Sequence, residues 1–586
     1  MQVFWRIATT VSIVVTVASV VSASITSLAG SVPAWPQWGQ NPQHSGTAVA
    51  AGQDLNRILA DLTFDPFVPQ EIKAPCNFCT HYQAPLIDGR DVFMEFKTGT
   101  YSGEQGWNTQ IWNEKRLRWQ DGRLVEQWNY ISDWKPDPNP FSIGSSPTER
   151  WGLSGWEPVF HAVLAGPFIY VPGASGAVWK LNKESGSILG RLTPFSNGAD
   201  FDPNTFVAGP LAADAAGNIY YNALKFDPAD PYGASGTDIA GAWLVRIGAD
   251  GSARSVEYRT LVPDAPTMCT TTFSLGQLPW PPSPTATPPQ GACGSQRPGI
   301  NVAPAIAPDG TIYTVSRAHL RTRYSYMVAL TADLSPQWHT SLRDFLNDGC
   351  NVLLPPNGTP GGCTEGATTG VDPATNERPA GRVIDQSSSS PSIAPDGSIL
   401  YGSYSRYNFA RGHLWKFSPS DGHIVATYDF GWDQTPAVFG HDGTYSIVVK
   451  DNHYDAGSYC NDKKFCPVAP AGPYYITRLN ANLSPEWKFQ NTNTFSCAYD
   501  NFGHLKCRDD HPGGFEWCIN APAVDPNGVV YANSEDGNLY AINPDGTLKQ
   551  SKFLRLALGA AYTPLALGDD GKIYTENFGD LFVVGN

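Results

Sequence analysis

The fold is most evident in residues 521–550, which read APAVDPNGVVYANSEDGNLYAINPDGTLKQ. Short segments rich in valine, tyrosine and isoleucine alternate here with the turn sequences Pro-Asn-Gly, Glu-Asp-Gly and Pro-Asp-Gly. Asn-Gly and Asp-Gly supply the positive φ, and proline the preset φ, that tight hairpins need. The run therefore predicts a four-stranded antiparallel meander of about 40 residues, the repeat length of a propeller blade.

The same pattern returns along the chain. Residues 303–313 read APAIAPDGTIY and residues 390–401 read SPSIAPDGSILY, while 330–338 (LTADLSPQW) and 479–487 (LNANLSPEW) are near copies. Blades are expected to begin near residues 83, 157, 209, 303, 390, 435, 521 and 563. We predict an all-β fold, a single eight-bladed β-propeller, with seven blades as the alternative if residues 83–128 are irregular. The spare strand at 55–64 would complete the last blade, so that N- and C-terminal strands close the ring and no sheet edge stays open.

Residues 1–23 predict a secretory signal peptide, because Arg6 precedes the apolar run Ile7–Val21 and Val21-Ser22-Ala23 offers a small-residue cleavage site. Cleavage as late as Ala29 is the alternative. A membrane anchor is disfavoured because the run is short and interrupted by threonine and serine. We therefore expect a secreted or periplasmic protein, with the propeller over 33–586 and no membrane span after cleavage. The net charge of −15 argues against nucleic-acid binding.

Ten of the eleven cysteines form close neighbours in sequence. In an oxidising compartment such neighbours predict disulfides that pin long loops, here the insertions at 131–155, 225–240, 264–300, 345–386, 451–473 and 492–517. The expected pairs are Cys76/Cys79, Cys269/Cys293, Cys350/Cys363, Cys460/Cys466 and Cys497/Cys507. Cys518 is left over and could instead take Cys497 or Cys507. No metal site is predicted: Thr80 separates Cys79 from His81, unlike c-type haem attachment, and zinc would want a second ligand pair of comparable spacing.

The repeated Pro-(Ala/Ser)-Ile-Ala-Pro-Asp-Gly motif, with Leu-Tyr-Ala-Ile-Asn-Pro-Asp-Gly-Thr-Leu, resembles the quinoprotein-like (PQQ-like) β-propeller repeat, and Trp35–Gly46 resembles that family's lead-in. The family includes PQQ-dependent alcohol dehydrogenases, propellers of outer-membrane assembly and extracytoplasmic proteins without known activity, so the resemblance implies fold more than function. The dehydrogenase branch clamps its quinone between a tryptophan and a disulfide of adjacent cysteines. This sequence has no adjacent cysteines and no haem domain. Its turns at 182–186 and 419–422 match the branch's Asp-x-x-Thr-Gly-x-x-x-Trp docking motif only loosely.

The resemblance also implies that residues just before each entering proline face the mouth of a central channel. Those positions hold Gln83, Glu157, Asn301, Ser389, Gln434, Asn520 and Tyr562. A ring of amides with one carboxylate could bind a polar small molecule or a cation. The alternative is that these side chains bond to one another and to channel water, because buried polar groups need partners.

Three hypotheses for function follow. The preferred one is a monomeric, non-catalytic binding or scaffold protein that uses one rim for a protein or glycan partner. The alternative is a divergent quinoprotein oxidoreductase for alcohols or sugars, with PQQ and Ca²⁺ in the central funnel. A third is a hydrolase or lyase acting through Asp451–Asp455 (DNHYD) and Asp509-Asp510-His511, where carboxylates and imidazoles sit close in sequence; solvated loop tips are the simpler interpretation of these clusters.

Overall fold

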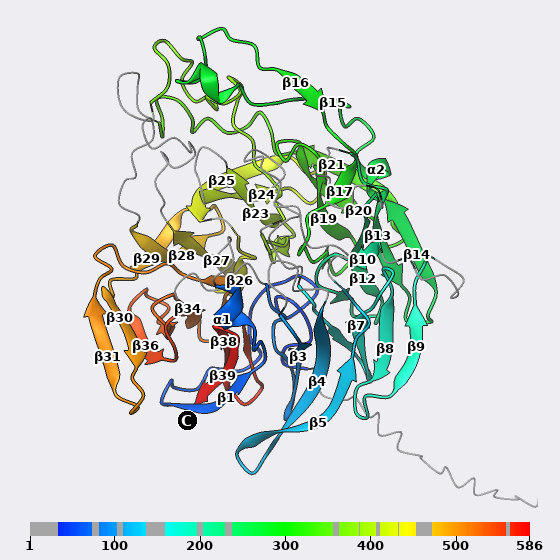
Figure 1. The fold of residues 1–586 in the computed structure, drawn as a ribbon, viewed down its shortest axis with the longest axis vertical. Coiled ribbons are helices and arrows are strands. Elements are labelled where there is room, and N and C mark those ends of the chain that lie inside the picture. Colours follow the sequence, from blue (N-terminus) through cyan, green and yellow to red (C-terminus); the bar gives the residue numbers. More distant parts are fainter. Residues whose placement is uncertain are drawn as a thin grey trace, which may run out of the picture. The chain divides into compact units, whose positions relative to one another are not determined.

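Eight four-stranded antiparallel sheets follow one another along the chain and form a ring (Figure 1). The computed structural model describes residues 33–72, 81–101, 109–135, 159–195, 202, 204–227, 229, 237–354, 362–385, 387–405, 411–431, 433–452, 472–557 and 563–586. The predicted eight-bladed propeller is therefore confirmed. The seven-bladed alternative is excluded, because residues 86–131 form a regular sheet.

The blades are numbered in chain order. Blades 1 to 4 comprise β2 (Leu86–Asp88), β3 (Asp91–Gly99), β4 (Gln110–Gln120) and β5 (Arg123–Ile131); β6 (Val163–Ala165), β7 (Phe168–Pro172), β8 (Val178–Asn182) and β9 (Ile188–Leu192); β10 (Thr205–Val207), β11 (Ala212–Ala213), β12 (Ile219–Lys225), β13 (Gly241–Ile247) and β14 (Ala253–Glu257); and β17 (Gln296–Pro298), β18 (Ala305–Ile306), β19 (Ile312–Ala318), β20 (Ser325–Leu330) and β21 (Pro336–Ser341). In blades 3 and 4 the innermost strand is split in two, which is why each has five segments.

Blades 5 to 8 comprise β22 (Ser392–Ile393), β23 (Ile399–Ser405), β24 (Arg411–Phe417) and β25 (Ile424–Gly431); β26 (Ala437–His441), β27 (Thr444–Asn452), β28 (Tyr474–Asn480) and β29 (Pro485–Gln490); β33 (Ala523–Val524), β34 (Val530–Asn533), β35 (Asn538–Ile542) and β36 (Leu548–Phe553); and β37 (Thr563–Leu567), β38 (Ile573–Asn577), β39 (Asp580–Gly585) and β1 (Arg57–Thr63). Short β32 (Ile519–Ala521) adds to β37 in parallel. Helix is confined, in the described part, to short turns such as α1 (Val68–Glu71) and α2 (Tyr258–Leu261), and no described helix has the length and apolarity to cross a membrane.

The ring is closed by the two ends of the propeller. Strand β1 pairs antiparallel with β39, from Arg57 opposite Gly585 to Thr63 opposite Asp580. The chain therefore supplies the fourth strand of blade 8 from its N-terminal side, as the strand predicted at 55–64 requires, and Figure 1 shows the C-terminus beside β1. Closure leaves no inter-blade gap at which a sheet could open.

The segment before β1, residues 35–53, is here called the lead-in strap. Its backbone contacts the innermost strands in blade order: Trp35 exchanges hydrogen bonds with Ile87, and Leu164, Ile306, Ile393, Val438 and Val524 donate to Pro36, Pro42, Gln43, Ser45 and Gly46. Gln37 bonds through its amide to Ala213 in blade 3, and Gln53 donates to Gly571 in blade 8. The strap thus runs once round the ring and touches all eight blades.

Neighbouring blades are joined by a recurring tryptophan contact. The indole N–H groups of Trp128, Trp338 and Trp487, on outer strands β5, β21 and β29, donate to turn carbonyls of the next blade, Lys183 (3.0 Å), Pro419 (3.1 Å) and Pro544 (2.9 Å). The indole of each tryptophan also packs over a glycine in the same turn. At Gly546, for example, an added Cβ would meet Trp487 at 2.7 Å. The near-copy segments 330–338 and 479–487 both end in a tryptophan that makes this contact, Trp338 and Trp487.

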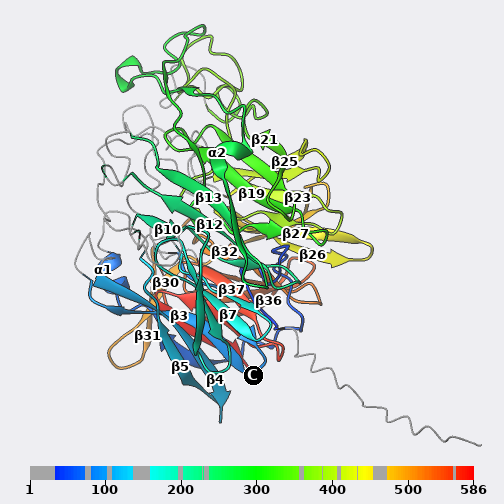
Figure 2. The ribbon, with the colours of Figure 1, turned by 90° about the vertical axis from the view of Figure 1, so that its right-hand side faces the viewer.

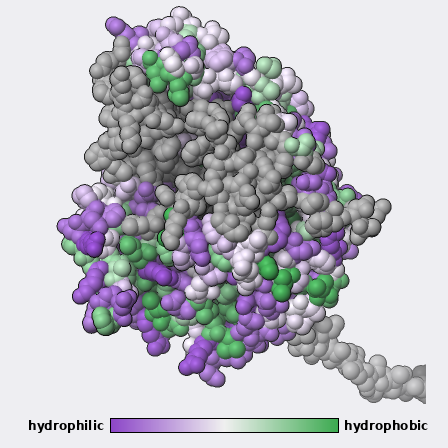
Figure 3. Space-filling model, in the orientation of Figure 1, coloured by the Kyte–Doolittle hydropathy of each residue, from purple (hydrophilic) through white to green (hydrophobic). Residues whose placement is uncertain are grey.

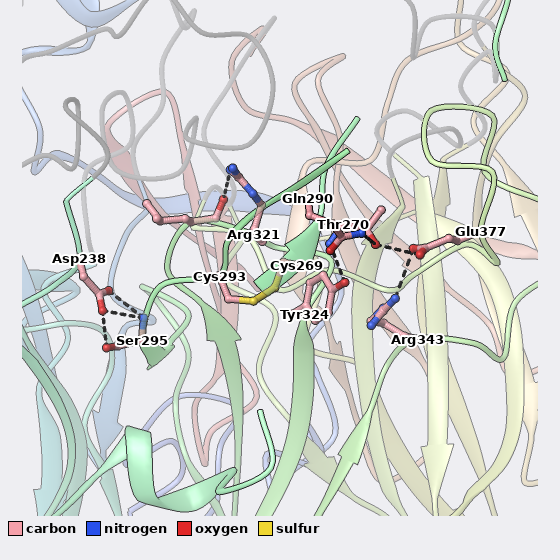
Figure 4. Close-up of a disulfide and its surroundings, with 11 residues drawn as sticks. Asp238, Cys269, Thr270, Gln290, Cys293, Ser295, Arg321, Tyr324, Arg343 and Glu377 are labelled. Carbon is pink, nitrogen blue, oxygen red and sulfur yellow. Dashed lines mark hydrogen bonds and ion pairs between the residues drawn. A yellow bond between two sulfur atoms is a disulfide. The ribbon is translucent and has the colours of Figure 1, made fainter. Parts of the chain in front are cut away.

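Two of the predicted insertions pack together into one lobe. Phe273, Trp280, Leu354 and Val371 share an apolar cluster with the Cys350–Cys363 disulfide, and Phe273 N donates to Ala374 O. Figure 2 shows this lobe beyond the blades (green, top). The Cys269–Cys293 disulfide ties β15 (Met268–Thr270) to the turn after β16 (Gln290–Ala292). Around it Asp238 bonds to Ser295, and Glu377 bonds to Thr270 and Arg343 (Figure 4). Apolar packing, and not only disulfides, therefore holds these insertions.

Candidate functional site

The predicted funnel residues lie at the inner ends of the blades. Gln83, Asn301, Ser389, Gln434 and Asn520 are all fully buried. Glu157 and Tyr562 lie outside the described residues. The five described residues, with the neighbours they bond to, are here called the polar ring.

Gln83 links blades 1 and 2. Its Nε2 donates to Glu114 Oε1 (3.1 Å) and Phe93 O (3.3 Å), and its Oε1 accepts from the backbone N–H of Ala162 (3.1 Å). Burial raises the pKa of Glu114 to about 8, and the bond from Gln83 only partly offsets that effect. Glu114 is therefore mostly protonated at neutral pH, so that it adds no net charge to the interior.

Asn301 makes the corresponding link between blades 2 and 4. It adopts a left-handed backbone conformation (φ 70°), which asparagine tolerates better than most residues. Its Oδ1 accepts from Val159 N (2.7 Å), and its Nδ2 donates to His81 Nδ1 (3.1 Å). The amide is thus fixed on both sides by other parts of the ring.

The remaining three residues are brought together by blades 5, 6 and 7. Ser389 Oγ donates to Gln434 O (2.8 Å), and Gln434 Oε1 accepts from Lys450 N (2.5 Å). Asn520 Nδ2 donates to Ser388 Oγ (2.8 Å), and its carbonyl accepts from Thr435 N (2.8 Å). Ser389 and Asn520 therefore bond to other blades, whereas the Gln434–Lys450 bond lies within blade 6, and Gln434 Nε2 has no hydrogen-bond partner among the described residues.

Two buried carboxylates, absent from the predicted set, carry the charge of the ring. Asp385 takes a bidentate pair of bonds from Arg297 (2.8 and 2.6 Å) and one from Arg317 (3.1 Å). Burial alone would raise the pKa of Asp385, but the two guanidinium groups outweigh it and hold that pKa well below its usual range. At Asp433, Ser388 N donates to Oδ1 (2.6 Å) and His81 Nε2 lies 3.9 Å from Oδ2. Burial opposes ionisation there too, but His81 and Lys450 lower the pKa of Asp433.

Two imidazoles are buried near the ring: His44 belongs to the strap, and His161 lies just before β6 of blade 2. His44 Nδ1 donates to Pro391 O (2.7 Å), and His161 Nδ1 donates to Ala162 O (2.6 Å). Burial lowers the pKa of His44 to about 4 and that of His161 to about 3. Trp38 lies edge-on to His161, with ring centroids 5.6 Å apart, and donates to Thr435 Oγ1 (3.0 Å). The strap therefore contributes the buried side chains of Trp38 and His44 to the interior of the propeller.

A second acidic group lies where blades 8 and 1 meet. Glu95 stands opposite Glu114 in the β3–β4 ladder, and burial together with the nearby Glu95 raises the pKa of Glu576 well above its usual value.

Within the described ranges, no three or more His, Cys, Asp or Glu side chains have an arrangement that could hold a metal ion. Among the described ring residues, Asp385 is already engaged by Arg297 and Arg317, and Cys518 is a free thiol, so neither residue matches the ligand set expected for PQQ with Ca²⁺.

The histidine clusters are not brought together as an acid–base site by the described residues. Asp451 is buried at the end of β27, where it accepts from Lys488 (2.8 Å) and Tyr428 (3.0 Å). Asp510 bonds to the adjacent His511 (2.7 Å) on the surface. Residues 453–455 lie outside the described part, as do Cys76, Cys79, Cys460 and Cys466. The structure contains Cys497–Cys507, and Cys518 is a buried thiol.

The residue just before each entering proline does not identify the charged groups Asp385 and Asp433 of the ring. Asp385 and Asp433 lie only a few residues upstream of such prolines, Pro391 and Pro436, and this spacing is the signal that could have found them. Arg297, a cationic partner of Asp385, lies near Cys293, in a segment that the sequence predicts as part of a loop.

No protein-family model and no curated protein matches this chain. Solved structures do match it. A europium-containing methanol dehydrogenase is 10% identical over 92% of this chain and 89% of its own, with a TM-score of 0.46. BamB from Moraxella catarrhalis is 10% identical over 90% and 99%, with a TM-score of 0.41. A quinohemoprotein alcohol dehydrogenase from Comamonas testosteroni is 11% identical over 94% and 80%, with a TM-score of 0.46. These identities bear on the fold alone.

Proposed function

We propose that this protein is an extracytoplasmic, non-catalytic scaffold that binds a protein or glycan partner through its rim. The observation that carries the proposal is the polar ring: the side chains of Gln83, Asn301 and Ser389 are all engaged by hydrogen bonds within the fold, and each has at least one bond to another blade. A substrate or cofactor site needs convergent polar groups that face the ligand. Groups already bonded across blade boundaries instead stabilise the ring, as buried polar groups do when they are satisfied.

The outer surface supports the same proposal. Large apolar side chains are exposed on it, among them Ile131, Ile188 and Phe502. In the view of Figure 3, hydrophobic residues are interspersed among hydrophilic ones on the described surface. Ile131 and Ile188 lie on the outer strands β5 and β9, which are surfaces that a partner could contact.

The test is reconstitution of the mature protein with PQQ, with and without Ca²⁺, followed by thermal unfolding and a dye-linked assay for alcohol and sugar oxidation. A ligand present at a hundred times its Kd would stabilise the native state by about 2.7 kcal/mol, a readily measured shift in Tm. We expect no Ca²⁺-dependent shift and no oxidation. Crosslinking in the native compartment should capture the same partner with the wild type and with Ser389→Ala, which alters only the ring. A Ca²⁺-dependent shift together with dye reduction would overturn the proposal.

A further inference from the structure

One hairpin stands outside the eight blades. Strands β30 (Phe495–Tyr499) and β31 (Leu505–Asp509) form a separate two-stranded sheet in the connection between blades 6 and 7 (Figure 1). The disulfide Cys497–Cys507 joins directly opposed residues, and Tyr499 packs on Phe553 of β36 with ring centroids 5.8 Å apart. Two-stranded hairpins are marginal by themselves, so the disulfide and this contact hold its shape. The hairpin is therefore a preformed projection.

Strand β31 has an open edge. The Cα atoms of Cys497 and Cys507 are 4.1 Å apart, which is the short spacing of a pair that exchanges no backbone hydrogen bonds. The backbone N–H and C=O groups of Leu505, Cys507 and Asp509 consequently point away from β30. All five residues of β31 are exposed, and within the described ranges β30 is the strand that pairs with it. The edge can accept one more strand.

The two faces of this strand differ in chemistry. Lys506 and Arg508 share one face and are exposed, with Asp500 4.0 Å from Lys506 Nζ. Leu505 lies opposite Tyr499 on the other face, beside the disulfide. Asp510, just beyond the strand, is already bonded to Ser496 and His511. On a protein of net charge −15, this edge thus presents Lys506 and Arg508 on one face, and Leu505 and the disulfide, followed by Asp509, on the other.

We propose that the β31 edge binds an extended segment of a protein partner as a third strand, and that this segment alternates acidic with apolar side chains. The inference rests on the proposed function and names its surface. Acidic side chains would lie beside Lys506 and Arg508, and apolar ones beside Leu505, because side chains on paired strands meet face by face. Phe502, 85% exposed at the hairpin tip, offers an anchor next to the bound strand. Lysine alone can protect an edge from pairing, but a protected edge does not require exposed Phe502 and Tyr499 beside it.

The probe is a short, end-blocked peptide that alternates glutamate with valine, and its control carries lysine at each glutamate position. We expect the mature protein to bind the glutamate peptide and the 505–509 segment to be protected from hydrogen exchange. The double variant Lys506→Glu/Arg508→Glu should weaken binding about tenfold or more and reverse the preference between peptides. Arg123→Glu, on exposed outer strand β5, is the matched control and should bind as the wild type does.

A second variant tests the backbone directly. Leu505→Pro removes an N–H that points outward, so we expect loss of peptide binding with an unchanged Tm, since proline is tolerated at such edge positions. Equal binding of both peptides, unaltered affinity in the double variant, absence of binding, or self-association through β31 seen by sedimentation would each overturn the inference. If the double variant still captures the native partner, the hairpin inference fails while the scaffold proposal stands; PQQ-dependent oxidation would overturn the scaffold proposal whatever the peptides do.

Discussion

Glu114 couples the stability of the polar ring to pH. The folded state holds its proton until about pH 8, whereas an unfolded glutamate titrates near 4.5. Between these values the unfolded state releases the proton and the folded state keeps it, so the free energy of unfolding falls by about 1.4 kcal/mol per pH unit. Below pH 4.5 the contribution is fully present, and above pH 8 it has been lost.

Glu114→Gln should remove this dependence. The amide oxygen can still accept from Gln83, so we expect Tm to match that of the wild type near pH 4.5 and to exceed it at pH 8. Thermal unfolding across this window measures the effect. Glu126→Gln, on the exposed side of β5, is the control and should leave the profile unchanged. An identical pH profile for Glu114→Gln and the wild type would contradict the assignment.

His44 should act in the opposite direction. Its folded pKa of about 4 lies below the 6.5 of the unfolded residue, so the unfolded state gains a proton first as the pH falls. Stability from this group is present above pH 6.5 and is lost between 6.5 and 4. His44→Gln, which can still donate to Pro391 O, should flatten the loss of Tm over that interval. A variant whose Tm falls as steeply as that of the wild type would count against it.

Between elements, the tryptophan contacts set how tightly the blades dock. Gly546 (φ 83°) lies under Trp487, whereas Gly443 (φ 75°) has no atom within 4 Å of an added Cβ. Alanine at either position bears the cost of a left-handed backbone, about 1 kcal/mol or more. Only Gly546→Ala must also displace Trp487, so it should lower Tm clearly more than Gly443→Ala. Equal decreases in Tm for the two variants would mean that the indole ring of Trp487 can be displaced without a cost in stability.

The blades themselves could be predicted because their turns are local. Pro-Asn-Gly at 526–528 and Pro-Asp-Gly at 544–546 determine hairpins without reference to distant residues, and the structure has strands on both sides of each. The strap and the Asp385 network could not be predicted in this way. Their partners are brought near by ring closure, and a buried Arg297 or Glu95 looks in sequence like an ordinary solvent-facing strand residue. Pairings of that kind depend on register across the whole chain.

At the scale of the molecule, closure by β1 is the feature on which the ring depends. A chain lacking residues 33–63 would lose both the strap and the fourth strand of blade 8, and would expose the edge of β39. We expect this truncated chain to unfold without a cooperative transition, which scanning calorimetry would measure, and to self-associate, which sedimentation would measure. Replacing the hairpin 494–511 by a short glycine–serine link is the control, and should leave a cooperative transition near that of the wild type. Cooperative, monomeric behaviour of the first variant would show that the ring closes without β1.

Ring closure also has a consequence for biosynthesis. Thr63 and Asp580, which hydrogen-bond across the closure, are 517 residues apart, so the ribosome makes the first half of the seam long before the second. The contacts of the strap with the eight blades are delayed in the same way, because each contact can form only after the corresponding blade has been synthesised. The nascent N-terminal segment must therefore remain without its native partners while the rest of the chain is synthesised. Non-native contacts can form during that interval. A chain truncated before β39 should therefore be cleaved by proteases along its whole length, and should not resist them as a stable propeller with fewer blades would.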